Sequence, residues 1–507
     1  MSRSASLLAI FTLLLTAPWA VQAQSRVPRG GLIRNDVANR VGLERSWFTR
    51  VQLDSARSRV AHVTQHISAT DAFSAWEITH DRGKLIYTER DLDDFGDELG
   101  KEKAEKLAQE KFEWLERAKL NPKMAVQVIP EITIYAMTDG GVVHAIDAQT
   151  GRTRWFTRVG NPNYPSEAPG ANDHYVAVLN GSTIYTLNQK NGEIAWTRQV
   201  RGAPGAGPAV TDRLVFVPMA NGAVEAYELD DHRQPPWIYK SHGRAVIQPI
   251  WTGYSVAWPT DVGHLYVAEG NDAAIQFRLE ANNSIVAQAA QLAPSRIVVA
   301  STDGYVYCID EQNGNLIWRF STGEPIIRSP VVVGDFVYVV TDENNLFRLS
   351  AADGRDEWTI NGVSGILSVS GTRLYCLGRV GRMVIVDSAS GSKLATLPTE
   401  TLDVQYLNTL TDRVIVGTSA GVLQCLHEIQ NHWPVIHAPA SEQPAKKATG
   451  KPAAGPAAAP RAAPADANPF GADPFGSGGT PAAEPPASKP PAGEPGSNPF
   501  GDDPFGG

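Results

Sequence analysis

Short segments of alternating apolar and polar residues, separated by tight turns, recur along most of the chain. The clearest copy runs from Asp303 to Thr322. Its turn signals, Asp303-Gly304 and Asn313-Gly314, supply the positive φ angles that short hairpin turns need. Between them lies YVYCID, whose β-branched and aromatic residues are typical of a half-buried strand. The stretch therefore predicts a β-hairpin, followed by a strand that carries Trp318.

This hairpin returns about every 40 residues. The best copies carry a tryptophan at equivalent positions, spaced by 41, 41, 81 and 40 residues: Trp155, Trp196, Trp237, Trp318 and Trp358. The spacing of 81 is two periods, and a weaker copy with Phe277 near the tryptophan position fits between. Two degenerate copies begin at Gly381 and Ala420, and the last of them stops before any tryptophan. Eight repeats are thus expected, the first beginning at Asp139.

A period of about 40 residues made of short strands is typical of an all-β propeller with four-stranded blades. A single blade cannot bury both of its faces, so the blades must pack side by side in a ring. We expect eight blades, with seven as the alternative. The tryptophans on the outermost strands, Trp47 included, are predicted to pack between neighbouring blades.

Closure of the ring is predicted from the first residues of the propeller. The segment WFTRV from Trp47 to Val51 is identical to the segment from Trp155 to Val159. Propellers avoid an exposed edge by full closure, and the last repeat lacks its final strand. The Trp47 segment is therefore predicted to complete the eighth blade, beside Val422 to Leu426. The stretch from Arg59 to Arg90 is predicted to be an extra partial blade or a decoration.

The chain divides into four expected parts. Residues 1–23 have the positive start, apolar core and small-residue cleavage site of a signal peptide. A linker is expected at 24–43, the propeller at 44–437 and a tail at 438–507. Since no cysteine lies near the cleavage site, no lipid anchor is expected there. The mature chain is expected to be exported, and to be periplasmic or associated with the cell envelope.

Residues 97–120 interrupt the strand pattern. Ala104, Leu107, Ala108, Phe112 and Leu115 follow helical spacing, and Asn121-Pro122 ends the pattern. The sequence predicts an amphipathic helix inserted between propeller strands. It is expected either to cap the propeller face or to dock a partner.

The tail is rich in Pro, Ala, Gly and Ser, a composition that does not bury enough apolar surface to fold. It contains two near-identical motifs, NPFGADPFG from Asn468 and NPFGDDPFG from Asn498. Their phenylalanines are candidate partner-binding residues: Phe470, Phe475, Phe500 and Phe505. Two interpretations stay open, a bivalent ligand for a partner and a low-complexity duplication.

Composition narrows the chemistry. The formal net charge of −9 argues against a nucleic-acid binder, which needs a basic stripe. The three cysteines, Cys308, Cys376 and Cys425, lie in apolar strand contexts and are expected to be buried free thiols, although an exported protein permits a disulfide. A metal pair at His62 and His66 is conceivable, but ordinary packing or surface roles are favoured.

The repeat DG-x-hydrophobic-Tyr-x-Ile/Leu-Asp, followed by Gly and Trp, resembles the pyrroloquinoline quinone-type propeller repeat. The resemblance covers roughly Met124 to Glu428. Two families share it: the quinoprotein dehydrogenases, which use the quinone and Ca²⁺, and the propeller subunit of the outer-membrane β-barrel assembly machinery, a non-catalytic scaffold. The dehydrogenases typically carry two adjacent cysteines, and no two cysteines are adjacent here. Asp147, Asp310 and Asp387 recur at the repeat period, which favours turn residues over a catalytic or metal site.

The favoured interpretation is a non-catalytic exported scaffold for proteins of the cell envelope or outer membrane, with no cofactor. A quinone-dependent dehydrogenase with a degenerate site and a ligand-sensing propeller are the alternatives. Arg201, Arg244 and Arg328 precede the inner strands of three repeats and are candidate partner-binding residues at one mouth of the channel. The sequence identifies neither a nucleic-acid partner nor a transmembrane segment, and it leaves any small-molecule ligand unknown.

Overall fold

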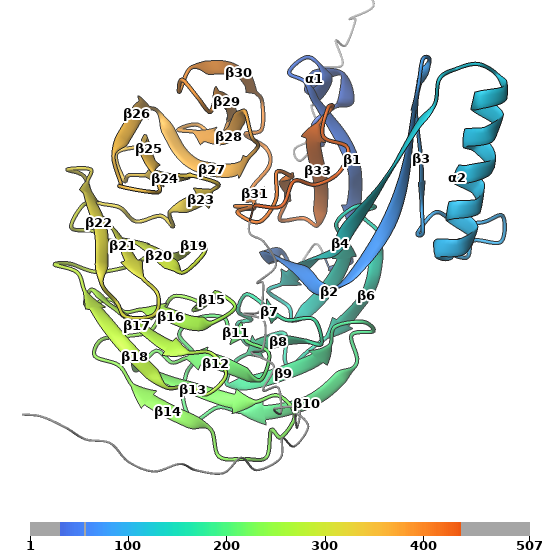
Figure 1. Ribbon diagram of the computed structural model, residues 1–507. Helices are drawn as coiled ribbons and strands as arrows, with labels where there is room; N and C mark the ends of the chain where they lie inside the picture. Colours follow the sequence, from blue (N-terminus) through green and yellow to red (C-terminus); the bar gives the residue numbers. More distant parts are fainter. Residues whose placement is uncertain (1–30, 55–56, 438–507) are drawn as a thin grey trace, which may run out of the picture. The chain divides into compact units, whose positions relative to one another are not determined.

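A computed structural model describes residues 31–54 and 57–437 of the chain. Eight antiparallel sheets surround a common axis (Figure 1). Seven sheets have four strands, and one has five. The eight-bladed propeller is confirmed and the seven-bladed alternative is wrong. The predicted signal peptide and tail lie outside the described residues.

The strands are given by blade, from the innermost to the outermost. The first blade consists of β2 (Val60–His80), β4 (Lys123–Thr138), β5 (Val142–Asp147) and β6 (Thr153–Arg158), with β3 (Gly83–Thr88) as its fifth strand beside β2. The second to fourth blades are β7 (Gly170–Ala171), β8 (Tyr175–Asn180), β9 (Thr183–Asn188) and β10 (Ile194–Gln199); β11 (Ala209–Val210), β12 (Leu214–Pro218), β13 (Ala223–Glu228) and β14 (Trp237–Lys240); and β15 (Ile250–Trp251), β16 (Ser255–Pro259), β17 (His264–Glu269) and β18 (Ile275–Glu280).

The fifth to seventh blades are β19 (Ala290–Leu292), β20 (Arg296–Ala300), β21 (Tyr305–Asp310) and β22 (Leu316–Ser321); β23 (Val331–Val333), β24 (Phe336–Val340), β25 (Asn345–Ser350) and β26 (Asp356–Asn361); and β27 (Val363–Val369), β28 (Arg373–Gly378), β29 (Met383–Asp387) and β30 (Lys393–Leu397). The eighth is β31 (Val404–Gln405), β32 (Val414–Thr418), β33 (Val422–Glu428) and β1 (Leu43–Arg50). The helices are α1 (Asn35–Asn39) and α2 (Gly100–Arg117).

The burial of each strand follows its place in the blade. Every residue of the second strand β12 is buried, because both of its faces meet a neighbouring blade. In the outermost strand β10 only Trp196 is buried. This is why tryptophan marks the outermost strands in the sequence: one large side chain must fill the seam between two blades.

Five of the six blade tryptophans donate an indole hydrogen bond across a seam to the next blade. The bonds are 2.7 to 3.1 Å long and join Trp47 to Ala148, Trp155 to Gln189, Trp196 to Leu229, Trp318 to Ala351 and Trp358 to Ser388, each at the backbone oxygen. The ring of Trp47 lies over Gly151, where a Cβ atom would come within 2.6 Å of it. Trp237 makes no such bond among the described residues and instead stacks on Tyr239 with ring centres 5.9 Å apart.

The ring closes as the sequence predicts. β1 pairs antiparallel with β33, placing Trp47 opposite Cys425 and Arg50 opposite Val422. Figure 1 shows the blue β1 beside the orange β33, so the two ends of the propeller share one blade.

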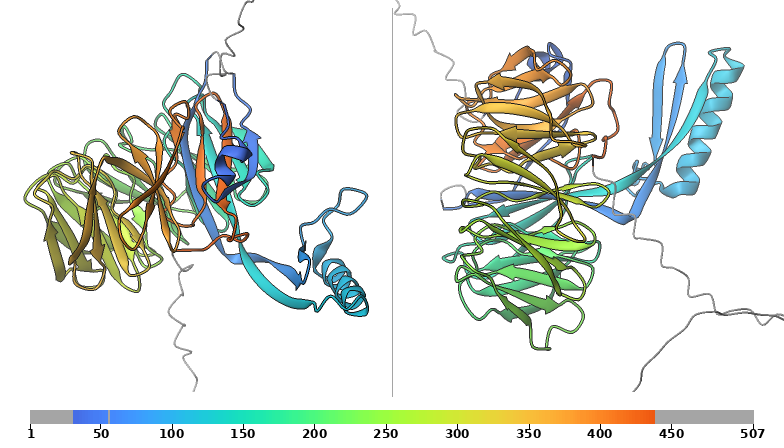
Figure 2. Two further views of the ribbon diagram at one scale, coloured as in Figure 1. Left: turned by 90° about the horizontal axis from the view of Figure 1, so that it is seen from above. Right: turned by 60° about the vertical axis from the view of Figure 1, so that its left-hand side comes forward.

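The segment from Arg59 to Arg90 is not an extra partial blade: its first part is a strand of the first blade, and only its second part is a decoration. Its strand β2 is the innermost strand of the first blade as far as Ile67, and after a bulge it continues from Ala72 beyond the blade. The second part of β2 pairs with β3 and with Lys123–Pro130 of β4. We call these three stretches together with α2 the arm, which stands away from the stacked blades in Figure 2.

The predicted helix is present, but it does not cap the propeller. α2 packs on β2 and β3 of the arm, where Ala104, Ala108 and Leu115 bury Trp76 and Ile78. This position could not be predicted from the sequence, because the strands that the helix covers are defined only by their pairing with β4.

Candidate interaction surfaces

The three candidate arginines lie on one face of the propeller. Each sits in a connection from the outermost strand of one blade to the innermost strand of the next: Arg201 between β10 and β11, Arg244 between β14 and β15, and Arg328 between β22 and β23. All three are exposed. Arg244 is neutralised by Asp261, with Nε 2.7 Å from the carboxylate, whereas Arg201 and Arg328 make no ion pair within the described residues.

The structure does not place the three arginines at equivalent positions. Gln248 and Gln288, one period apart, bridge neighbouring connections: the Gln288 amide donates to the Gln248 backbone oxygen at 3.1 Å, and the Gln248 amide to Pro208 at 2.9 Å. Arg328 holds the next position of this series, 40 residues after Gln288. Arg328 therefore lies closer in sequence to the innermost strand that follows it than Arg201 and Arg244 do to theirs.

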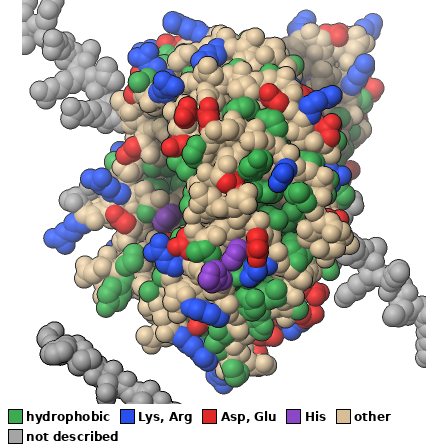
Figure 3. Space-filling model, turned by 90° about the vertical axis from the view of Figure 1, so that its left-hand side faces the viewer, with side chains coloured by type: hydrophobic (Ala, Val, Ile, Leu, Met, Phe, Trp, Pro, Cys, Tyr) green, Lys and Arg blue, Asp and Glu red, His purple; other side chains and the backbone are tan. Residues whose placement is uncertain are grey.

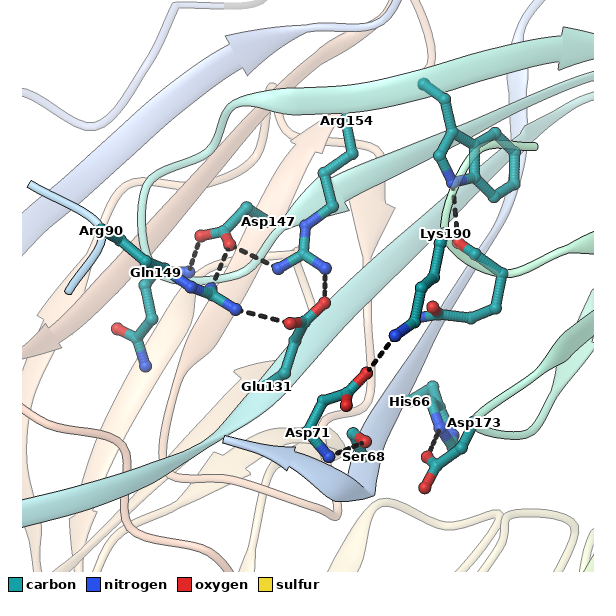
Figure 4. A network of polar contacts seen from close by, with 12 residues as sticks. His66, Ser68, Asp71, Arg90, Glu131, Asp147, Gln149, Arg154, Asp173 and Lys190 are labelled. Carbon is teal, nitrogen blue, oxygen red and sulfur yellow. Dashed lines mark hydrogen bonds and ion pairs between the residues drawn. The ribbon is translucent and has the colours of Figure 1, made fainter. Parts of the chain in front are cut away.

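A second surface begins at the root of the arm, on the face opposite these connections. Arg90 and Arg154 form a four-membered ion-pair cluster with Glu131 and Asp147 (Figure 4). Arg90 lies 2.7 Å from Asp147 and 2.6 Å from Glu131, and Arg154 lies 2.6 Å from Asp147. Burial, together with the charge of Arg90, lowers the pKa of Arg154 to about 10. The cluster ties the segment after β3 to β4, β5 and β6.

Asp173 fixes the bulge at which β2 leaves the blade. Its carboxylate accepts hydrogen bonds from the backbone of Ala69 and Thr70, from the Thr70 hydroxyl and from His66, the last at 2.8 Å. Figure 4 shows His66 and Asp173 facing each other near this bulge. Burial alone would raise the pKa of Asp173, but the hydrogen bonds from His66 and Thr70 outweigh it and hold the pKa well below its usual range.

The root of the arm is thus held by two polar clusters from different blades. The sequence singled out Asp147 only as a turn residue and missed its partners Arg90, Glu131 and Arg154. Asp173 was also missed, because its partners on β2 lie about a hundred residues earlier. The repeat of about 40 residues in the sequence does not indicate these contacts, because each of them occurs in one place in the ring.

The other candidate positions behave as ordinary structure. His62 and His66 contact different groups, Ser166 and Asp173. Asp147, Asp310 and Asp387 accept backbone hydrogen bonds within their own turns, as turn residues do. The three cysteines are buried free thiols, which confirms that prediction. Within the described part of the chain, no group of three or more His, Cys, Asp or Glu side chains is placed to hold a metal ion.

The face of the molecule drawn in Figure 3 has no large patch of uniformly positive or uniformly negative charge. Lys and Arg side chains are interspersed there with Asp and Glu, and with separate apolar areas. The candidate phenylalanines Phe470, Phe475, Phe500 and Phe505 lie outside the described residues. Over residues 31–54 and 57–437, none of the helices has the length and apolar character needed to cross a membrane.

Comparisons with known proteins agree with this architecture. The family described as outer membrane protein assembly factor BamB matches residues 96–235, 139–274 and 255–428. The chain is 24% identical to outer membrane protein assembly factor BamB of Yersinia pestis over 285 residues, which is 52% of this chain and 63% of that protein. It is 22% identical to the BamB of Moranella endobia (strain PCIT) over 314 residues, 57% of this chain and 70% of that protein.

A solved structure shares the fold. The crystal structure of BamB from Moraxella catarrhalis superposes with a TM-score of 0.50 at 14% identity, covering 58% of this chain and 91% of that one. The chain matches less than two thirds of the length of the Yersinia relative, and at this identity the structural likeness concerns the fold.

Proposed function

The chain belongs to the family of outer membrane protein assembly factor BamB, and from this membership we propose that it is a non-catalytic scaffold in the assembly of outer-membrane proteins. The observation that carries the proposal is the family match, which runs through the propeller from residue 96 to residue 428. Residues 1–23 support an exported chain that works in the periplasm or at the cell envelope. Its partners in this proposal are other proteins of the assembly machinery.

We place the partner contact on the face that carries the connections between blades. Arg201 and Arg328 are exposed there, and neither forms an ion pair among the described residues. An unpaired guanidinium suits a carboxylate on a partner, because it donates two parallel hydrogen bonds to it. The net charge of the chain is −9, so exposed arginines without an acidic neighbour are positive positions on a chain that is negative as a whole. Such a position helps to orient a partner that carries a carboxylate.

The test is a charge reversal on this face. Arg201→Glu and Arg328→Glu together should reduce recovery of the outer-membrane assembly proteins with the tagged chain by about tenfold or more, the order expected for reversing close charge pairs. The matched control is Arg152→Glu, an exposed arginine in the β5–β6 turn on the opposite face. It should leave that recovery unchanged.

The functional readout is the folded fraction of outer-membrane β-barrel proteins in cells that lack the chain. Loss of the chain should lower it, and the parent but not the double variant should restore it. Unchanged barrel levels without the chain would reject the scaffold function. Full restoration by a double variant that melts like the parent would reject only the proposed face.

A further inference from the structure

The arm carries an open strand edge. From Lys123 to Pro130, β4 pairs with β2 on one side, residue by residue from Thr79 to Ala72. On its other side β5 begins to pair only at Thr133. No hydrogen bond from the rest of the described chain reaches the outer side of Met124 to Ile129. Half of the backbone N–H and C=O groups of this stretch therefore point away from the sheet.

One face of this edge is apolar. Residues opposite each other in paired strands share a face, so Met124 and Val126 lie on the same face as their partners Ile78 and Trp76. α2 covers Ile78 and Trp76 but stops short of β4, whose residues do not enter that cluster. Met124, Val126 and Val128 consequently remain 37%, 56% and 71% exposed in a row beside the helix.

The opposite face of the edge is small and polar only from Ala125 to Gln127, because Ile129 on the same face is buried against Phe73 and Ala75. Ala125 and Gln127 alternate with the apolar row and are both exposed. Two rows of different character on one strand match an added strand that also alternates between apolar and polar side chains. A uniformly charged or uniformly apolar segment would mismatch one of the two rows.

The edge lacks the features that normally block such pairing. Soluble proteins protect edge strands with charges, prolines or bulges. Lys123 and Pro130 bound the open stretch, but Met124 to Ile129 contains no charged residue, no proline and no glycine. The register shifts of the β2–β4 pairing lie at Val60–His62 and Ile67–Ala72 of β2, outside the part that pairs with the open stretch. Because the edge is uncharged, it complements a neutral strand, whereas charges placed against it would be left without a counter-ion.

The edge is also held in place. The cluster of Arg90, Glu131, Asp147 and Arg154 fixes the base of β4, and Asp173 fixes the bulge of β2. A fixed edge loses little conformational entropy when it accepts a strand, so more of the hydrogen-bond energy remains for binding.

We propose that the edge of β4 from Met124 to Ile129 binds an extended segment of an unfolded outer-membrane β-barrel chain by strand addition. Strands of such barrels alternate between apolar and polar residues over about ten residues. The apolar side chains would lie beside Met124, Val126 and Val128 on one face, and the polar ones beside Ala125 and Gln127 on the other. This inference rests on the proposed function for the identity of the bound chain, but the binding itself is measured without the assembly machinery.

The probe is a neutral peptide of about ten residues that alternates between apolar and polar side chains, the length of one barrel strand. A peptide of the same composition, with its apolar residues in one block, serves as the comparison. The full chain should bind the alternating peptide, seen as a rise in fluorescence anisotropy, and bind the blocked peptide at least about tenfold more weakly. Hydrogen exchange should show new protection of those amides between Met124 and Ile129 that point away from β2.

The variant Val126→Lys with Val128→Lys places two charges on the apolar row and should weaken binding by about tenfold or more. Val380→Lys is the matched control, because Val380 is 68% exposed and lies between β28 and β29. It should bind like the parent, and all three chains should have the same melting temperature.

Three results would overturn the proposal. Equal binding of the peptide by the double-lysine variant is one, and protection elsewhere than on β4 is another. The third is a parent that forms dimers which the double-lysine variant does not form, without taking up peptide, since the edge would then pair with a second copy. Failure of the Arg201 and Arg328 test with intact peptide binding would reject the proposed face and leave the strand site standing.

Discussion

The indole of Trp47 donates a hydrogen bond of 2.7 Å to the backbone oxygen of Ala148, 101 residues further along the chain. Trp47 belongs to the last blade and Ala148 to the first, so this contact crosses the seam at which the ring closes. The seam depends on a strand, β1, that is separated in sequence from its partner β33 by the entire propeller.

Replacing Trp47 with Ala should therefore destabilise the ring as a whole. Truncating a buried tryptophan costs about 3–5 kcal/mol, and Trp47 is nearly fully buried between two blades. The free energy of unfolding in denaturant should fall by that amount, and deletion of Gly42 to Leu53 should unfold the ring cooperatively. Trp114→Ala, on the exposed side of α2, is the control. A melting temperature unchanged by the deletion would contradict closure by β1.

Asp173→Asn should loosen the point where the arm leaves the blade, most of all near neutral pH. The folded state holds the pKa of Asp173 below its unfolded value, so its contribution is present above the unfolded pKa and is lost as the pH falls through the folded one. At pH 7 the variant should be less stable by about 1–3 kcal/mol, the cost of losing charge-assisted hydrogen bonds.

The measurement is denaturant unfolding of both chains between pH 7 and pH 3. The difference between parent and variant should shrink as the solution is acidified, and hydrogen exchange from Ser68 to Asp71 should be faster in the variant at pH 7. Asp94→Asn changes an exposed carboxylate in the connection between β3 and α2 and should do neither. A difference that grows on acidification would show that Asp173 is not stabilised as a carboxylate.

The thiols should be inert until the ring unfolds. Burial raises the pKa of Cys308 to about 11 and the pKa values of Cys376 and Cys425 to about 12, so the reactive thiolate is scarce at neutral pH. A chromogenic thiol reagent should modify none of the three in the native chain and all of them in denaturant. Modification of the native chain at the rate of a free peptide thiol would contradict the burial of these strands.

Pyrroloquinoline quinone and Ca²⁺ should not bind stoichiometrically. The chain has no adjacent cysteine pair, and Asp147, Asp310 and Asp387 each accept hydrogen bonds from their own turns. Calorimetry should give no saturable heat, and a dye acceptor should not be reduced in the presence of alcohols or sugars. Tight binding would favour the dehydrogenase interpretation over the scaffold.

The tail should act in partner binding and not in the stability of the propeller. Its two motifs begin 30 residues apart, at Asn468 and Asn498. Changing all four phenylalanines to Ala should leave the melting temperature unchanged and abolish recovery of at least one envelope partner. Because two linked sites bind with avidity, changing one motif should reduce that recovery by much more than half. Recovery of the same partners by the fourfold variant would make the tail a spacer.

The repeated parts of the fold could be predicted from the sequence, because equivalent positions in most blades have the same environment and carry the same type of residue. The turn signals and Trp155, Trp196 and Trp318 stand at one period, and the identical WFTRV segment gave the closing strand. Trp237 shares the period but not the indole hydrogen bond across the seam, and it stacks on Tyr239 of its own strand. Period alone therefore predicts a position better than it predicts a contact.

The arm could not be predicted, because it depends on contacts that occur only once. Nothing in the alternation of β2 marks Ile67 as the last residue inside the blade, and the exit is fixed by Asp173 from the next blade. Likewise, the open edge of β4 is visible only when the place where β5 begins to pair is known. Unique features of a repeat protein must be sought where the repeat is interrupted, here around residues 97–120.

Pairing of the first strand with the last has a consequence for synthesis. Arg50 pairs with Val422, 372 residues further along the chain, so β1 stays unpaired until the chain between them has emerged in the compartment where it folds. Throughout that interval the hydrophobic surface of β1, with Trp47 and Phe48, has no blade to join. Vectorial folding from the N-terminus can build the inner blades but cannot complete the ring. Until the last blade has emerged, β1 therefore exposes an unpaired strand edge and apolar side chains, which chaperones bind.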